Sequence, residues 1–132
     1  MRDAFHEELD AIQATLVTMG EMVSTAMSRS SEALLNADVK LAEQVISDDE
    51  KLDTIQHDLE ARSINLMARQ QPVAQDLRIL VTSLRMSADL ERMGDLCHHI
   101  AKLARMRYPE VAVPAELVKT IENMGTTAVK TV

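Results

Sequence analysis

Apolar residues recur along the chain in alternating steps of three and four, the spacing of one face of an α-helix. The first series runs from Phe5 to Ala26, and its helix is expected to end between Leu35 and Ala37. Asp38 follows as an expected N-cap of the next helix. The second series consists of Leu41, Val45, Leu52, Ile55, Leu59 and Leu66. The pattern therefore predicts two long helices joined by a short turn.

A third helix is predicted after the turn that ends at Pro72, a residue that suits the first turn of a helix. This segment carries two apolar series, which indicates contact with two neighbouring helices. The first series is Leu77, Val81, Leu84 and Ala88, and the second is Ile79, Met86, Leu90, Met93, Cys97 and Ile100. The segment RYPEVAVP ends the pattern. A fourth helix is predicted from Pro114 or Ala115 onward and is still running at Val132.

Helices of roughly 30 residues joined by short turns pack as an up-and-down antiparallel bundle. We therefore predict an all-α fold, with an antiparallel three-helix bundle over residues 1–110. The segment TLVTMG at residues 15–20 is echoed by TIENMG at residues 120–125, with Thr, an aliphatic residue, Met and Gly in register. The echo predicts that residues 111–132 hold a linker and the first part of the first helix of a second, truncated bundle.

Composition fits a helical fold and narrows the function. The 132 residues include nine Met, one Phe, one Tyr and no Trp, so the predicted core is aliphatic and sulfur-rich. The net charge of −7 argues against nucleic-acid binding, which needs a basic surface. The single cysteine cannot form an internal disulfide, and there is no signal peptide or apolar run of the ~20 residues that a membrane span needs. These features predict a cytoplasmic protein that binds cations or basic partners.

Acidic residues continue the first apolar series of the third predicted helix. The next positions are Glu91, Asp95 and His98, and the two acids lie one turn apart on one face. Asp49 and Asp53 form a matching pair on the second predicted helix. Both pairs are at similar distances from the turn between these helices, so antiparallel packing is expected to place them at one level.

Carboxylates that meet at one level repel each other unless a proton, a basic side chain or a metal ion lies between them. Oxygen-rich cages suit divalent and trivalent ions, and a histidine shifts the preference toward iron, manganese or zinc. We therefore predict a metal site. Its candidate ligands are Asp49, Asp53, Glu91, Asp95 and His98. The alternative is a cluster without metal, either solvated or neutralised by Arg92 or Lys102.

The third predicted helix and the turn before it read ARQQPVAQDLRILVTSLRMSADLERMGDLCHHIAK. This segment resembles the signature of the PhoU family, whose members carry a similar RQP turn followed by DLR and by DLERIGD. The resemblance extends to DDEKLDTIQHDLE and implies a full-length protein of two tandem three-helix bundles. It also implies a repeated E(D)xxxD motif that binds iron or zinc in some members. Asp49 with Asp53 and Glu91 with Asp95 match that motif.

The resemblance further implies a cytoplasmic accessory protein of the phosphate ABC transporter, peripheral to the membrane through its partners only. The implied partners are the transporter's ATPase subunit and the sensor histidine kinase of the phosphate-starvation two-component system. The protein would act as a negative regulator of that response, through protein contacts and without catalytic residues.

Two alternatives remain open. One is a di-iron carboxylate enzyme, for which Asp95 and His98 loosely match a Glu-x-x-His motif. The other is a structural helical bundle without metal. The unpartnered face of the fourth helix is also compatible with a homodimer.

Overall fold

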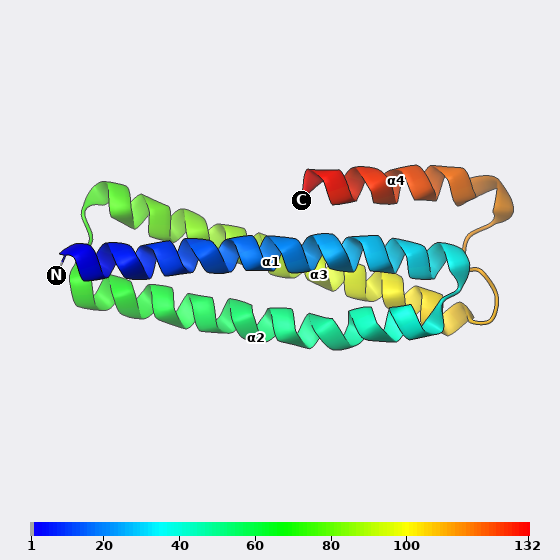
Figure 1. The fold of residues 1–132 in the computed structure, drawn as a ribbon, viewed down its shortest axis with the longest axis horizontal. Helices are drawn as coiled ribbons and strands as arrows, with labels where there is room; N and C mark the ends of the chain where they lie inside the picture. Colours follow the sequence, from blue (N-terminus) through cyan, green and yellow to red (C-terminus); the bar gives the residue numbers. More distant parts are fainter. Residues whose placement is uncertain (1) are drawn as a thin grey trace.

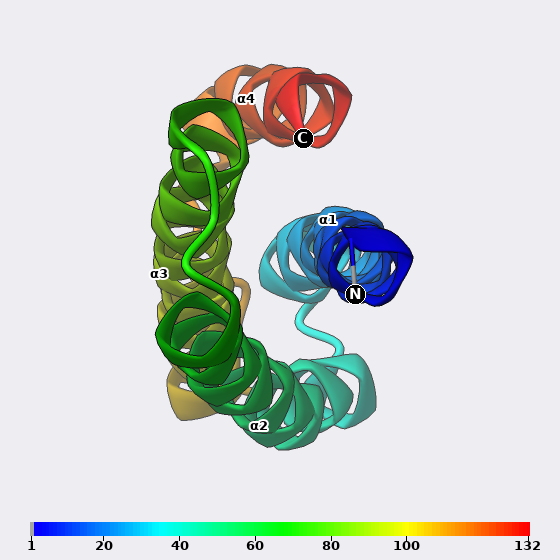
Figure 2. The same ribbon diagram turned by 90° about the vertical axis from the view of Figure 1, so that its left-hand side faces the viewer.

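The structure, a computed structural model, describes residues 2–132, which form an all-helical fold. Three long helices, α1 (Arg2–Asn36), α2 (Val39–Gln70) and α3 (Ala74–Arg107), run antiparallel to one another in sequence order (Figures 1 and 2). The short 3-10 helix η1 (Ala115–Leu117) leads into α4 (Val118–Thr131), which lies antiparallel along the C-terminal half of α1 (Figure 1). The predicted three-helix bundle is confirmed. No helix between residues 2 and 132 combines the length and hydropathy needed to cross a bilayer.

The helix ends agree with the sequence pattern except at the start of α3. Ala37 adopts a left-handed conformation after α1 (φ 52°), and the Asp38 side chain caps α2 by accepting a hydrogen bond from the Leu41 N–H at 3.1 Å. Gln71 is likewise left-handed after α2 (φ 43°). Pro72 precedes α3, which begins two residues later, so its predicted place in the first turn is wrong. The fourth predicted helix begins as the 3-10 turn η1.

The core consists of two clusters along the length of the bundle. The cluster nearer the α2–α3 turn contains large side chains: Phe5, Leu9, Ile12, Leu16, Met19, Val23, Leu52, Leu59, Leu66 and Leu80. The predicted stripe of α1 supplies the first six of these, so its orientation is confirmed. The cluster nearer the α1–α2 turn contains mostly small side chains: Ala33, Leu34, Ala42, Val45, Cys97, Ala101 and Ala104. Large apolar side chains thus fill the core at one end of the bundle, and small side chains let the helices pack closely at the other end.

The centre of the α3 interface is not either of the two predicted apolar series. Leu77 and Met86, one from each series, are 40% and 48% exposed. The buried row of α3 consists mainly of small residues, of which only Cys97 belongs to a predicted series: Leu80, Ser83, Ser87, Gly94, Cys97, Ala101 and Ala104. Small side chains let α3 approach α1 and α2 closely, so the two apolar series lie at the margins of the contact.

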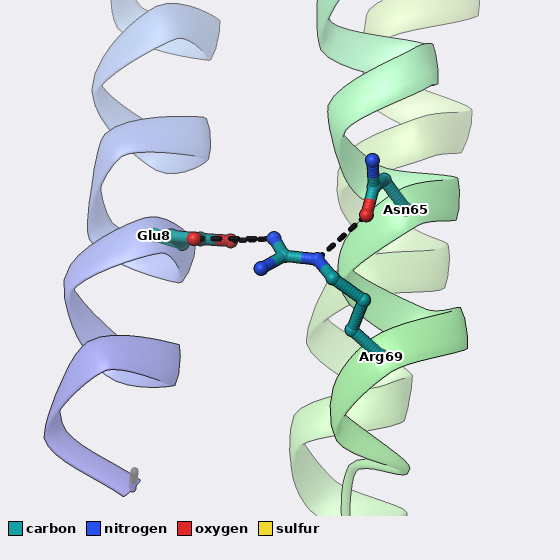
Figure 3. Close-up of polar contacts among 3 residues, drawn as sticks. All are labelled: Glu8, Asn65 and Arg69. Carbon is teal, nitrogen blue, oxygen red and sulfur yellow. Dashed lines mark hydrogen bonds and ion pairs between the residues drawn. The ribbon is translucent and has the colours of Figure 1, made fainter.

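A polar clamp joins the last turns of α2 to the first turns of α1 (Figure 3). Arg69 Nη2 donates hydrogen bonds to both carboxylate oxygens of Glu8, at 3.0 and 3.2 Å, and Arg69 Nε donates one to Asn65 Oδ1 at 2.6 Å. At the same end of the bundle, His6 Nε2 lies 3.4 Å from Asp76 Oδ2. These surface contacts link α1 to both α2 and α3.

Candidate metal centre

The two predicted acidic pairs meet between α2 and α3. Asp49, Asp53 and Asp95 each place one carboxylate oxygen within 4.8 Å of the other two. The Glu91 carboxyl borders this group, close enough to Asp53 and Asp95 for both to raise its pKa. The carboxylates lie at the boundary between the two core clusters. Leu52, near Asp53 in sequence, belongs to the cluster of large residues, and Cys97, near Asp95, belongs to the cluster of small ones. Antiparallel packing thus brings both pairs to one place.

Gly94 permits the close approach of α2 and α3 at this level. A Cβ added to Gly94 would clash with the Leu52 side chain and lie 3.3 Å from Asp49 Oδ1. The apolar pattern of the sequence does not single out Gly94, although an isolated glycine inside a helical pattern is a recognised signal of close packing. A larger residue at this position forces the Leu52 side chain to shift beside the carboxylates.

His98 contacts the three-carboxylate group through Asp49 alone among its hydrogen bonds in the described residues. Its Nδ1–H donates a hydrogen bond to Asp49 Oδ2 at 2.9 Å, and the side chains of His98 and Asp49 are only 20% and 9% exposed. The hydrogen bond holds one oxygen of Asp49 in place and uses Nδ1, which leaves Nε2 as the only histidine nitrogen available to a metal. In this geometry His98 orients Asp49.

Two carboxylate oxygens of the cluster, Asp49 Oδ1 and Asp53 Oδ1, are buried and have no hydrogen-bond partner among the residues that the structure describes. A buried acceptor left unsatisfied costs about 1–3 kcal/mol, and more when it is charged. Arg92 and Lys102 are exposed and form no ion pair within residues 2–132. The predicted alternative in which these two basic residues neutralise the acids is therefore wrong.

The protonation of the cluster follows from its burial and its crowding. Burial, together with hydrogen bonds to Asp53 and Asp95 and repulsion by their charges, raises the pKa of Glu91 to about 7. Burial and the same two charges raise the pKa of Asp49, whereas the hydrogen bond from His98 acts in the opposite direction. Near neutral pH a proton on Glu91 relieves part of the repulsion, so a cation that enters the cluster competes with that proton.

A groove of about 310 Å³ between α1 and α2 reaches the cluster, since Asp49 and Gly94 are among its lining residues. At its rim, Asp48 pairs with Arg29 at 3.5 Å and with Lys51 at 3.2 Å. The acid next to Asp49 in sequence is thus already neutralised by basic side chains. Asp48 is therefore paired with basic side chains, whereas Asp49 keeps one buried oxygen, Oδ1, without a hydrogen-bond partner among the described residues.

Two other histidines and the cysteine stay outside the cluster. His99 and His57 are exposed. Cys97 is fully buried, and burial raises the pKa of its thiol to about 11, so it stays protonated at neutral pH. All five candidate ligands come from α2 and α3, whereas di-iron bundle enzymes take theirs from four helices. The arrangement is that of a small carboxylate site between two helices.

Comparisons with known proteins agree with the predicted resemblance. A family model described as "PhoU domain" matches residues 16–104, which include all five candidate ligands. The chain is 45% identical to "Phosphate-specific transport system accessory protein PhoU homolog 2" of Mycobacterium tuberculosis, over 98% of this chain and 61% of that protein. It is 36% identical to a PhoU homolog of Rhizobium meliloti, over 92% of this chain and 51% of that protein.

A solved structure also resembles this fold. The crystal structure of PhoU from Pseudomonas aeruginosa aligns with a TM-score of 0.85 and 27% sequence identity, over 96% of this chain and 60% of that chain. The chain thus spans less than two thirds of the length of the relatives that it matches. Because the family model covers most of the chain, and because fold and sequence point the same way, the chain belongs to the PhoU family.

Proposed function

We propose that the protein is a regulatory accessory of phosphate transport and that it acts through protein contacts, not through catalysis. The observation that carries this proposal is the 45% identity, over almost the whole chain, to a protein named as an accessory of a phosphate-specific transport system. The finer proposal is a cytoplasmic negative regulator of the phosphate-starvation response. It would contact the ATPase subunit of the phosphate transporter and a sensor histidine kinase.

Binding to these two partners tests the proposal. The purified ATPase subunit and the cytoplasmic region of the kinase are each immobilised, and retention of the protein is measured in buffers with and without phosphate. We expect retention by at least one of the two partners. Failure to bind either partner under both conditions would contradict the adaptor role.

We further propose that the carboxylate cluster binds one metal ion, with iron, manganese and zinc as candidates. Asp49, Asp53 and Asp95 would hold the ion, Glu91 would join them after losing its proton, and His98 would orient Asp49. The support is the pair of buried, unpartnered oxygens on Asp49 and Asp53, which a cation would satisfy. Carboxylate oxygens are the ligands that such hard or borderline ions accept. The ion would fix α2 against α3.

Titration calorimetry with Mn²⁺, Zn²⁺ and Fe²⁺ under anaerobic conditions tests the metal site. We expect binding of one ion per chain, with loss of binding when Asp53→Asn and Asp95→Asn are combined. Asp48→Asn is the matched control, because Asp48 is the neighbouring acid that Arg29 and Lys51 already neutralise. If the double variant binds metal as the wild type does, these residues are not the ligands.

A further inference from the structure

The charged side chains on the surface are unevenly distributed among the long helices. α1 exposes mainly acids: Asp3, Glu7, Asp10, Glu21 and Glu32. Within residues 74–107 of α3, by contrast, Asp89 is the one exposed acid, and the exposed basic residues are Arg78, Arg85, Arg92, Lys102, Arg105 and Arg107. A chain with a net charge of −7 thus presents one basic helix on its surface.

The arginines of α3 also differ from those of the other helices in their partners. Arg29, Arg62 and Arg69 each form an ion pair with a carboxylate, at 3.5, 3.6 and 3.0 Å. Among the described residues no arginine of α3 forms an ion pair, although Asp89 lies within reach in sequence. The guanidinium groups of α3 therefore remain available to carboxylates of another molecule.

Three of these arginines lie in a line along α3. Arg78, Arg85 and Arg92 recur every seven residues, which is close to two helical turns, so they lie on nearly the same side of the helix. Leu96 and Leu103 lie beside this line at the same interval and are 55% and 45% exposed. These five residues form a surface that we call the basic ridge. It extends over roughly 38 Å at a rise of about 1.5 Å per residue.

No other helix within residues 2–132 covers the basic ridge. Arg85 and Arg92 each lie two residues before a member of the buried row, Ser87 or Gly94, a step of about 200° around the helix. The ridge therefore faces away from α1 and α2, on the side of α3 that Figure 2 shows free of other helices. α4 packs on α1 and makes no contact with α3.

We propose that the basic ridge is the docking surface for an acidic amphipathic helix of a partner protein, an inference that rests on the accessory role proposed above. The carboxylates of that helix, spaced seven residues apart, face the arginines, and its apolar side chains cover Leu96 and Leu103. A helical occupant fits because two helices that cross at a small angle meet again every seven residues.

Charge and shape argue against two other occupants of the ridge. A nucleic acid or an anionic bilayer spreads negative charge over an area much wider than one helix. Either would bring that charge close to the acidic remainder of the protein, whose net charge of −7 opposes the contact. A single acidic helix matches the ridge in width and meets its basic side chains only.

Binding to the immobilised ATPase subunit and kinase region tests the ridge. Arg85→Glu combined with Arg92→Glu turns two attractions into repulsions, and we expect the Kd to rise about tenfold or more. Lys40→Glu combined with Arg62→Glu is the matched control, because it changes the net charge equally on α2, and it should leave the Kd unchanged. All four side chains are exposed, so thermal denaturation should show that both variants fold as the wild type does.

Arg85→Lys tests the chemistry of the occupant. This variant keeps the positive charge and introduces an amine, which a carbodiimide couples to a neighbouring carboxylate with loss of water. We expect mass spectrometry to find an amide bond from position 85 to an Asp or Glu in a helical segment of the bound partner. A bound partner with no acid coupled at this position would contradict docking on the ridge.

The outcomes separate this inference from the accessory role. Binding that survives Arg85→Glu with Arg92→Glu overturns the inference and leaves the accessory role intact. A wild-type chain that binds neither partner contradicts the accessory role and removes the inference with it. If the same double variant instead abolishes binding to phosphatidylglycerol vesicles, or dissociates a dimer of the chain in sedimentation, the ridge contacts a membrane or a second copy, and the inference is wrong.

Discussion

Because Gly94 has no side chain, it leaves space for Leu52 and Asp49 beside the carboxylate cluster. We expect Gly94→Ala to lower the free energy of unfolding by about 2 kcal/mol, because its Cβ would clash with Leu52 in a well-packed core. The same Cβ comes within 3.3 Å of Asp49 Oδ1, so metal affinity should fall as well. Urea denaturation and titration calorimetry measure the two effects. Gly20→Ala is the control, and it should stabilise the chain by about 0.5 kcal/mol because it meets open space.

Glu91 should make the stability of the metal-free protein depend on pH. Its pKa is raised from 4.5 to about 7, so the folded state holds the proton more tightly than the unfolded state does. The contribution of this proton to stability is therefore complete below pH 4.5 and is lost as the pH rises through about 7. Glu91→Gln keeps a hydrogen-bonding side chain but does not titrate.

The urea midpoints of wild type and Glu91→Gln, followed from about pH 4 to about pH 8, measure this effect. We expect the wild type to lose stability relative to the variant over that range, most steeply between pH 4.5 and about 7. Chelator is present throughout so that metal does not compete with the proton. Parallel profiles would show that Glu91 ionises in the folded state as it does in the unfolded chain.

The sequence was sufficient to place the acids of the cluster but not to assign each contact. Asp53 and Glu91 were predicted at one level because equal distances from a turn in antiparallel helices follow from the rise per residue alone. The hydrogen bond from His98 to Asp49 and the role of Gly94 depend on the rotation of each helix about its own axis. A rotation of a few tens of degrees decides these contacts, and residue spacing does not determine it.

At the scale of whole helices, both α1 and α3 were predicted, but only for α1 was the buried face predicted correctly. The stripe of α1 consists of large apolar side chains, which give a strong period in the sequence. The buried row of α3 contains Ser83, Ser87 and Gly94, which give no such signal. Ser87 is compatible with burial because its hydroxyl donates to the Leu84 carbonyl at 2.7 Å. Hydrophobic periodicity thus identifies helix faces that pack through large apolar side chains. It misses faces whose small residues let the helices come close together.

The turn between α1 and α2 offers a stabilising substitution. Ala37 has a φ of 52°, a left-handed conformation that costs a residue with a Cβ about 1 kcal/mol or more. We expect Ala37→Gly to raise the free energy of unfolding by about 0.5 kcal/mol after the greater freedom of glycine in the unfolded chain is subtracted. Ala61→Gly, the same change at an exposed position inside α2, should lower it by about as much. Thermal denaturation of the two variants should show opposite signs, and a loss at both positions would contradict the role of the left-handed turn.

For the whole molecule, the position of the carboxylate cluster determines how a bound ion would act. The cluster lies where the large-residue and small-residue parts of the core meet, and all its carboxylates come from α2 and α3. A ligand that binds only the folded state stabilises it by mass action, by about 2.7 kcal/mol when its concentration is 100 times its Kd. We therefore expect saturating Mn²⁺ to raise the Tm of the 132-residue chain by several degrees.

Hydrogen exchange should show where that stabilisation acts. Since the ion would tie α2 to α3, amides of these two helices on both sides of Asp53 and Asp95 should gain protection, whereas α4, which packs on α1, should gain little. The combined variant Asp53→Asn and Asp95→Asn should show neither the rise in Tm nor the added protection. If Mn²⁺ instead protects α4 as strongly as α3, the ion acts elsewhere on the molecule, because the cluster has no ligand on either α1 or α4 among the residues described.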